Sequence, residues 1–404
     1  MGFHPLGVAY PWDAVAPLRG RALLHPDGLV DLSIGTPVDP TPDVVRRALA
    51  DASDAHGYPM VAGTTQLRTA VADFFARRRG VPGLSPEAVL PTIGSKELVA
   101  LLPSQLGLGP GDVVVVPTAA YPTYEVGARL AGAEVLASDD PAEWAGREEV
   151  ALVWVNSPAN PTGEVLGVDA LAAVVAAARE VDAVVASDEC YAQLPWTAPW
   201  TDAVADGGGV PCILDERVSG GDHTGLLAVY SLSKQSNLAG YRAAFAAGDA
   251  ALVDQLLQQR RHLGMMLPWP VQQAMAAALA DDAHVTEQVE RYRARRETLL
   301  PALVAAGFEV DHSEAGLYLW VRPGDALRAR LAVDGGDGEV VDAPETDDAP
   351  EAPCWPVMRL LAEHGILAGP GVFYGPAAAG HVRISLTATD ERVAAAASRL
   401  AAWS

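Results

Sequence analysis

Cysteine is scarce in this chain, and basic residues are few relative to acidic ones. The three cysteines, Cys190, Cys212 and Cys354, are odd in number and far apart, so they predict neither a disulfide framework nor a zinc site. We therefore expect a reducing, cytoplasmic compartment. Lysine and arginine number 28 against 51 acidic residues, which gives a net charge of −23. This argues against nucleic acid as a partner, because binding a phosphate backbone needs clustered cations.

Long hydrophobic runs are missing as well. No apolar stretch approaches the roughly 20 residues that cross a bilayer, and no basic and apolar leader opens the chain. We therefore expect no membrane partner. What is present is a chain of 404 residues, half of them hydrophobic, with 38 glycines and 31 prolines dispersed along it. This length predicts two domains, or a large domain with an appended smaller one.

Short valine-rich segments alternate with helical patterns between residues 88 and 245. The valine-rich segments are continuous apolar runs, which are typical of a sheet covered on both faces. The alternation predicts an α/β fold with a large, doubly wound, mostly parallel sheet. The expected strands are 89–93, 113–116, 134–136, 150–155, 183–186, 226–230 and 243–246. The expected helices are 96–106, 123–130, 168–180 and 250–263.

Three segments are expected along the chain. Residues 1–40 are rich in proline and glycine and predict an irregular N-terminal arm that packs with the small domain. Residues 41–268 form the large domain, and residues 269–404 form a smaller C-terminal α+β domain. Within the small domain, the acidic segment 334–353 cannot bury apolar surface, so we interpret it as a surface loop. Its carboxylates match no calcium-loop spacing, and we expect no metal.

The most informative stretch is YSLSKQSNLAGYRAAF, residues 230–245. Lys234 follows an apolar strand candidate, where desolvation lowers the pKa of an amine and frees it to form a Schiff base with an aldehyde. Ser231 and Ser233 add short hydrogen-bond donors, and Arg242 offers a guanidinium suited to phosphate. Taken alone, the two basic residues of such a motif are more often a solvated loop lysine and a surface arginine.

Residues at the ends of other strand candidates decide between these alternatives, because ligands of doubly wound sheets bind at the carboxyl ends of the strands. Gly94, Ser95 and Lys96 open a helix and present free amides to an anion, or form an ordinary N-cap. Asp188 ends the run AVVASD. A carboxylate there needs a cationic partner, such as a protonated ring nitrogen, or else caps a helix.

Further side chains suit a flat, anionic ligand. Tyr121 can stack on a ring or simply pack in its loop. Asn160 and Tyr191 can bond a ligand oxygen, although Asn160 is also a turn former. Gly35 permits close backbone approach, and Arg383 lies within an apolar strand, where an arginine is costly unless it faces an anion. Together these groups specify an aldehyde, a phosphate and a protonated aromatic ring, which is the description of pyridoxal 5′-phosphate (PLP).

The motifs SPANPTG, SDECY, SLSKQSNLAGYR and RISL occur in the order seen in the class I and II aminotransferases of PLP fold type I, and the chain resembles that family over its whole length. The resemblance implies that Lys234 holds the aldehyde, with Lys234, Asp188 and Tyr191 as catalytic residues. It implies that Asp188 meets the ring nitrogen, that Asn160 and Tyr191 bond the ring oxygen and that Tyr121 stacks on the ring. The phosphate neighbours that it implies are Gly94, Ser95, Lys96, Ser231, Ser233 and Arg242. The substrate-binding residues that it implies are Gly35, Asn160 and Arg383, with Arg383 clamping the α-carboxylate.

Tyr58 resembles the tyrosine that reaches the phosphate of the neighbouring subunit, which implies a homodimer, although simple packing is its alternative role. The segments IGSKELVALLP and SEAGLYLW resemble the actinobacterial type of N-succinyldiaminopimelate aminotransferase. That resemblance implies amino transfer from glutamate to N-succinyl-2-amino-6-oxopimelate in lysine and diaminopimelate biosynthesis. An aminotransferase for another amino acid, a carbon–sulfur β-lyase and a non-catalytic PLP-binding regulatory module share the scaffold and stay as alternatives.

Overall fold

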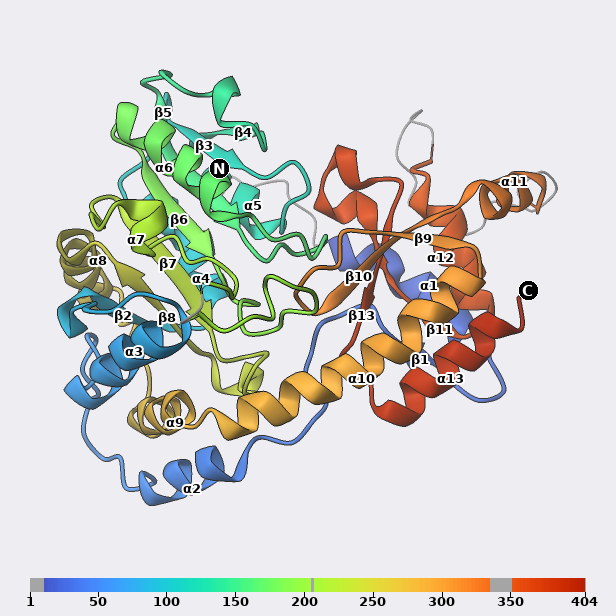
Figure 1. Cartoon of the computed structure of the whole chain (residues 1–404), viewed down its shortest axis with the longest axis horizontal. Coiled ribbons are helices and arrows are strands. Elements are labelled where there is room, and N and C mark those ends of the chain that lie inside the picture. The colour runs from blue at the N-terminus through green and yellow to red at the C-terminus, as the bar shows by residue number, and fades with distance from the viewer. Residues whose placement is uncertain (1–10, 205–206, 335–350, 404) are drawn as a thin grey trace, which may run out of the picture.

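The protein, described here from a computed structural model, has two groups of elements that lie side by side (Figure 1). The structure describes residues 11–204, 207–334 and 351–403. Most of the acidic segment expected as a surface loop, 335–350, lies outside the described residues. The helices are α1 (Ala16–Ala22), α2 (Asp43–Asp51), α3 (Thr65–Arg78), α4 (Ser95–Gln105), α5 (Thr123–Ala131), α6 (Val168–Glu180), α7 (Glu216–Ser219), α8 (Ala250–His262), α9 (Trp269–Ala280), α10 (Ala283–Ala305), α11 (Asp325–Asp334), α12 (Cys354–Glu363) and α13 (Asp390–Ala401). The strands are β1 (Val30–Asp31), β2 (Val89–Ile93), β3 (Val113–Val116), β4 (Glu134–Ala137), β5 (Val150–Asn156), β6 (Val184–Asp188), β7 (Leu226–Ser231), β8 (Ala243–Gly248), β9 (Phe308–Asp311), β10 (Tyr318–Pro323), β11 (Ile366–Leu367), β12 (Gly369–Pro370) and β13 (Val382–Ser385).

The large sheet has seven strands in the order β2-β8-β7-β6-β5-β3-β4. Strand β8 runs antiparallel to both of its neighbours, and the pairs from β7 to β4 are parallel. Successive residues of a strand point to opposite faces. Accordingly, Val113 and Val115 join one hydrophobic core, whereas Val114 and Val116 join another. Both faces are therefore covered, and the predicted fold class is confirmed.

Helix α3 shows why the helices of the large sheet form where they do. Its buried residues Leu67, Val71, Phe74 and Phe75 recur at helical spacing, so one stripe faces the core. The side chain of Thr64 accepts a hydrogen bond of 3.1 Å from the backbone N–H of Leu67 and satisfies a free amide at the start of the helix. The helix therefore begins immediately after Thr64.

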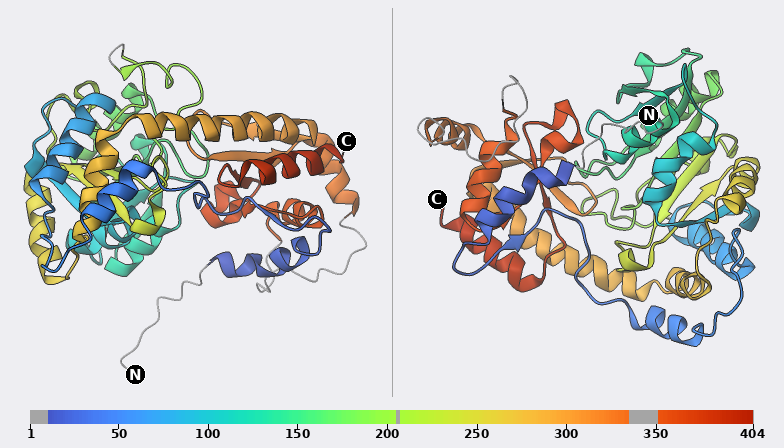
Figure 2. Two further views of the ribbon diagram at one scale, coloured as in Figure 1. Left: turned by 90° about the horizontal axis from the view of Figure 1, so that it is seen from below. Right: turned by 180° about the vertical axis from the view of Figure 1, so that it is seen from behind.

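A second group of strands and helices forms around residues from both ends of the chain. Its four-stranded sheet has the antiparallel order β12-β13-β10-β9. One hydrophobic core joins Leu18 of α1 and Val30 of β1 to Leu319, Met358 and Ile384. Helix α1 lies beside α12 in both views of Figure 2, and the long helix α10 runs between the two groups. The first and last parts of the chain therefore fold together.

The expectation of an irregular segment over residues 1–40 is wrong for the part that the structure describes. Residues Pro11–Val15 form a 3-10 helix that continues directly into α1. The short strand β1 also lies within this segment and pairs in parallel with β11. The physical reason is tertiary packing, because α1 contacts α12, a partner more than 300 positions away in the sequence.

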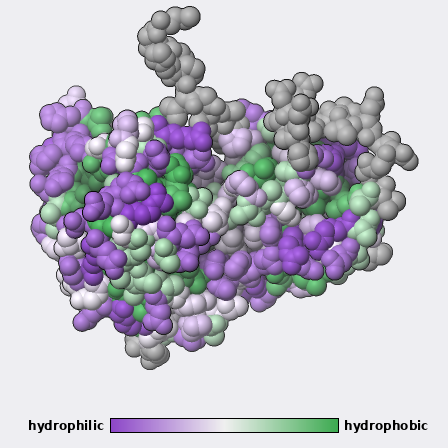
Figure 3. All heavy atoms as spheres, turned by 90° about the horizontal axis from the view of Figure 1, so that it is seen from above, coloured by the Kyte–Doolittle hydropathy of each residue, from purple (hydrophilic) through white to green (hydrophobic). Residues whose placement is uncertain are grey.

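The molecular surface agrees with the acidic composition. Hydrophilic side chains cover most of the face drawn in Figure 3, with smaller hydrophobic patches between them. Among the described helices, none combines the length and the hydropathy that a membrane crossing requires.

Candidate active site

A cavity of about 750 Å³ opens where the two groups of elements meet. The large sheet contributes Asn156 from the end of β5 and Asp188 from the end of β6, both at carboxyl ends of parallel strands. The smaller sheet contributes Tyr318 of β10 and Arg383 of β13, and the connecting segment before α2 contributes Gly35. Segments far apart in the sequence thus converge on one space, as expected for a ligand site of a doubly wound sheet.

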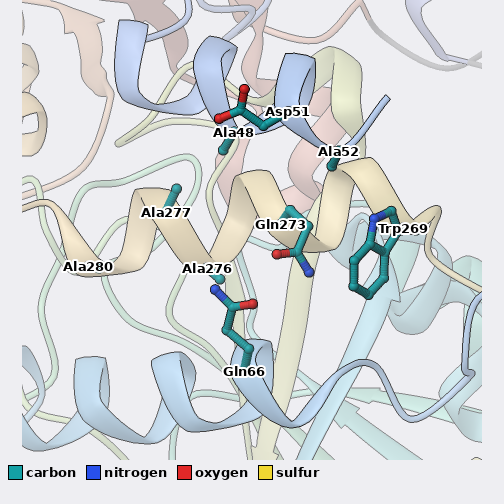
Figure 4. Close-up of a pocket in the computed structure, with 9 residues that line it drawn as sticks. All are labelled: Ala48, Asp51, Ala52, Gln66, Trp269, Gln273, Ala276, Ala277 and Ala280. Atoms are coloured by element: carbon teal, nitrogen blue, oxygen red, sulfur yellow. The ribbon is translucent and has the colours of Figure 1, made fainter. Parts of the chain in front are cut away.

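A second hollow, of about 400 Å³, lies between helices α2, α3 and α9 (Figure 4). Its lining consists largely of alanines from α2 and α9, together with two glutamines and Trp269. Asp51 is the only ionisable side chain among the described residues that line it. This hollow offers neither a nucleophile nor a cation, so the cavity between the two groups is the candidate active site.

Lys234 lies on the loop after β7 with its amine directed into the cavity. Burial lowers the pKa of this amine, and the neighbouring guanidinium groups of Arg383 and Arg242 lower it further. The Nζ atom donates a hydrogen bond to the backbone oxygen of Gly35. A lowered pKa makes the neutral, nucleophilic form of the amine available at lower pH than in a solvated lysine.

Asp188 is buried at the end of β6 and has two hydrogen-bond donors. The hydroxyl group of Tyr124 donates to its Oδ2 at 3.0 Å, and the backbone N–H of Cys190 donates to its Oδ1 at 3.2 Å. The ring of Tyr124 is itself stacked on Trp154, with ring centroids 4.9 Å apart. Burial raises the pKa of Asp188, whereas the two hydrogen bonds lower it. The carboxylate is therefore oriented, and no cation pairs with it among the described residues; a protonated ring nitrogen would supply one.

An anion cradle forms at the N-terminus of α4. Gly94 precedes the helix with φ +76°, and a Cβ atom there would lie 2.2 Å from Nη2 of Arg242. Only glycine therefore lets the guanidinium lie over this backbone. The hydroxyl groups of Ser231 and Ser233 are 2.8 Å apart, and both residues line the cavity with Ser95 and Arg242. Free amides, hydroxyls and a guanidinium together suit a phosphate group.

Arg383 is buried among aromatic rings at the far side of the cavity. Its guanidinium lies 3.9 Å from the ring centroid of Tyr318 and 5.8 Å from that of Trp12. Its Nη1 donates to Oδ1 of Asn160 at 2.7 Å and its Nη2 to the backbone oxygen of Ser33 at 2.7 Å. Its buried Nε has no hydrogen-bond partner among the described residues. An oriented guanidinium with an unsatisfied N–H is a suitable clamp for a carboxylate.

Comparisons with known proteins agree with this geometry. Residues 27–400 match the family model described as aminotransferase class I and II. The chain belongs to the class I and II aminotransferases. This aminotransferase is 52% identical to a probable aminotransferase of Mycobacterium tuberculosis, over 97% of this chain and 84% of that protein. It is 51% identical to the 4-dedimethylamino-4-oxo-anhydrotetracycline transaminase OxyQ of Streptomyces rimosus, over 97% of this chain and 98% of that protein.

A solved structure extends the comparison to the fold. The N-succinyldiaminopimelate aminotransferase from Mycobacterium tuberculosis superimposes with a TM-score of 0.79 at 25% sequence identity, covering 98% of each chain. The family is PLP-dependent, and the cavity of this aminotransferase fits that cofactor. The fit rests on the buried amine of Lys234, the uncompensated carboxylate of Asp188 and the cradle that a Cβ on Gly94 would fill.

The structure gathers most of the residues singled out from the sequence. The predicted residues that line the cavity are Gly35, Ser95, Lys96, Tyr121, Asn160, Asp188, Tyr191, Ser231, Ser233, Lys234, Arg242 and Arg383. Gly94 lies against Arg242 at its edge. Tyr58 is the exception, since it is 95% exposed and is absent from the lining of the cavity. No group of described His, Cys, Asp and Glu residues could hold a metal ion.

Sequence reasoning missed Tyr124, Tyr318 and Trp12. The hydroxyl group of Tyr318 lies 3.3 Å from that of Tyr191, and its position explains Gly35, where a Cβ atom would lie 2.1 Å from that hydroxyl. The sequence gives a weak signal for Tyr124 only, which follows the predicted ring-stacking Tyr121 by three positions and lies in the first turn of α5.

Proposed function

We propose that this aminotransferase moves an amino group from glutamate to N-succinyl-2-amino-6-oxopimelate, as a cytoplasmic homodimer of lysine and diaminopimelate biosynthesis. One observation carries the transaminase chemistry: the buried amine of Lys234 shares a cavity with the oriented guanidinium of Arg383. An amino acid whose carboxylate binds Arg383 is thereby held with its reacting carbon near a proton carrier. The succinylated acceptor is favoured by the sequence resemblance and by the structural likeness at 25% identity.

Different residues of the site would hold the cofactor, move a proton and bind the substrate's carboxylate. PLP, when bound, supplies an aldehyde that captures the amino group and a ring that accepts electrons from the substrate. Asp188, oriented by Tyr124 and Cys190, holds a proton at the ring nitrogen. Lys234 would remove the proton from the substrate's Cα as general base. As general acid it would then return this proton to the carbon of the cofactor's aldehyde group. Arg383 fixes the carboxylate, and Asn160 orients Arg383.

A polycyclic aromatic ketone is a second candidate acceptor. It is favoured by the 51% identity to OxyQ, whose name specifies a tetracycline-type substrate. It is also favoured by the aromatic lining around Arg383, where the rings of Trp12, Tyr318 and Tyr374 approach the guanidinium. Such rings offer large flat contact surfaces to a fused-ring substrate.

One assay separates these candidates from each other and from the lyase. The purified enzyme is incubated with glutamate and one acceptor at a time, and formation of the aminated acceptor is measured. The acceptors are N-succinyl-2-amino-6-oxopimelate, a simple keto acid and a polycyclic aromatic ketone. A succinylated acceptor preferred by about 100-fold or more in kcat/KM supports the proposal, since this is the discrimination that one or two charged contacts provide. If simple keto acids are used equally well, the proposal of a succinylated acceptor is refuted. In a separate incubation with cystathionine and no keto acid, release of pyruvate identifies a β-lyase.

A further inference from the structure

Tyr318 lines the cavity but has no role in the proposed function. It lies on β10, and only 3% of the residue is exposed. The centroid of its ring is 3.9 Å from the guanidinium group of Arg383. This contact explains an aromatic ring at the position, but a phenylalanine ring would attract the guanidinium as well. The hydroxyl group of Tyr318 therefore needs an explanation of its own.

The hydroxyl group of Tyr318 has a fixed place in the cavity wall. There is room for it because residue 35 is a glycine, where a Cβ atom would lie 2.1 Å from the hydroxyl oxygen. The backbone oxygen of Gly35 in turn accepts the hydrogen bond from Nζ of Lys234. On its other side the hydroxyl oxygen is 3.3 Å from that of Tyr191, and the two rings meet edge to face with centroids 5.8 Å apart. Packing thus holds this hydroxyl group against Tyr191.

The direction of the hydrogen bond between the two tyrosines follows from their protons and from the charges around them. A tyrosine hydroxyl has one proton to donate. If Tyr191 gives its proton to the ring oxygen of PLP, as the family resemblance implies, Tyr318 must be the donor between the two. Burial raises the pKa of both hydroxyl groups, but the cations Arg383 and Lys234 bring the pKa of Tyr318 below its usual value. The more acidic hydroxyl group is the stronger donor, so the charges favour the same direction.

We propose that Tyr318 is a positioning residue whose hydroxyl group donates a hydrogen bond to Tyr191 and so directs the Tyr191 hydroxyl group at the ring oxygen of PLP. This inference rests on the proposed function in one respect, since it takes Tyr191 as the partner of that oxygen. A hydroxyl group that accepts one hydrogen bond becomes a better donor in the next, because successive hydrogen bonds polarise one another. The pair therefore stabilises negative charge on the ring oxygen more than Tyr191 alone would.

A pH titration of the absorbance of the PLP-loaded enzyme, without substrate, tests the proposal. The absorbance of bound PLP changes when it loses a proton, and a hydrogen bond to its anionic ring oxygen lowers the pH of that change. Tyr318→Phe keeps the ring beside Arg383 and removes only the hydroxyl group. We expect it to raise the midpoint of the titration by about 0.5 to 1 pH unit, the equivalent of one hydrogen bond. Tyr230→Phe is the matched control and should leave the midpoint in place. Tyr230 is buried as well, but its hydroxyl group donates to Gln235 and the residue is absent from the cavity lining.

A double variant separates an effect through Tyr191 from a direct effect on the cofactor or on Lys234. Tyr191→Phe should raise the midpoint at least as far as Tyr318→Phe does. The double variant should raise it no further than Tyr191→Phe alone, because Tyr318 then has no hydroxyl group to direct. An unchanged midpoint in Tyr318→Phe, or single shifts that add up in the double variant, overturns the proposal. The titration needs no turnover, so a wild-type enzyme that aminates none of the proposed acceptors would refute the proposed function and leave this result standing.

Discussion

Asp188 shows most clearly how burial and hydrogen bonds in this site act on the pKa of a side chain. Burial raises the pKa of its carboxyl group, and the hydrogen bonds from Tyr124 and Cys190 oppose that shift. Because a neutral carboxyl group cannot hold the proton of a ring nitrogen, the ionised form is the useful one. The hydroxyl group of Tyr124, which donates to Oδ2 at 3.0 Å, therefore favours the ionised form that the proposed function needs.

Tyr124→Phe should move the acid limb of the activity profile to higher pH. The substitution removes a hydrogen bond that favours the ionised carboxylate, so the pKa of Asp188 rises and a higher pH is needed to ionise it. The phenyl ring keeps its stacking on Trp154, which limits any packing change. The measurement is kcat/KM against pH for both proteins. An acid limb that stays in place would show that Tyr124 does not act on Asp188.

The individual residues of the site were predictable to different degrees. Lys234, Asp188 and Arg383 are charged residues that follow, end or interrupt an apolar run, which is visible in one sequence. Tyr318 breaks no such rule, and its partner Tyr191 stands 127 positions away in the chain. Only the fold brings the two hydroxyls together, so no local pattern could have indicated the contact.

At the scale of elements, a buried ion pair joins the end of α3 to the end of β6. Nη2 of Arg79 donates to Oε2 of Glu189 at 2.6 Å, and both side chains are 1% exposed. The guanidinium also donates to the backbone oxygens of Val210 and Pro211, and Oε1 of Glu189 accepts from the backbone N–H of Ile213. This pair holds together three segments directly behind Asp188.

Arg79→Met should destabilise the protein by about 3–5 kcal/mol, because it leaves a buried carboxylate without its cation. Replacing both partners, as Arg79→Met with Glu189→Met, should recover much of that loss, since an apolar pair needs no charge compensation. Chemical denaturation of the single variant, the double variant and the wild type measures the free energy of unfolding of each. If Arg79→Met alone lowered the free energy of unfolding by less than the double substitution does, this account of the ion pair would be contradicted.

The elements were predictable wherever packing follows a local pattern. Apart from the edge strand β4, the strands of the large sheet are largely buried, and the predicted ranges match β2 and β3 residue for residue and the other strands to within two residues. Helix α1 was missed because a proline- and glycine-rich composition dominates residues 1–40 and because its partner α12 lies at the opposite end of the chain. Such long-range packing leaves no local periodic signal.

At the scale of the whole molecule, we propose that Tyr58 completes the site of a partner subunit. It is 95% exposed, its neighbour Met60 is 61% exposed, and neither lines the cavity of its own chain.

We expect sedimentation to give twice the mass of one chain. Tyr58→Phe should weaken PLP retention by about 10-fold, the value of one hydrogen bond to a charged group, without dissociating the dimer. Met60→Leu is the control. A monomeric active enzyme would refute the shared site.

The central claim is that amino transfer takes place at Lys234, and isotope transfer tests it most directly. The enzyme is incubated with ¹⁵N-glutamate and N-succinyl-2-amino-6-oxopimelate, and the product is examined by mass spectrometry. We predict ¹⁵N in the new amino group, an equal amount of 2-oxoglutarate, and a rate at least about 10²- to 10⁴-fold lower in Lys234→Ala, since that variant lacks the proton carrier. Unlabelled product, or a Lys234→Ala variant that transfers the label at the wild-type rate, would contradict the account.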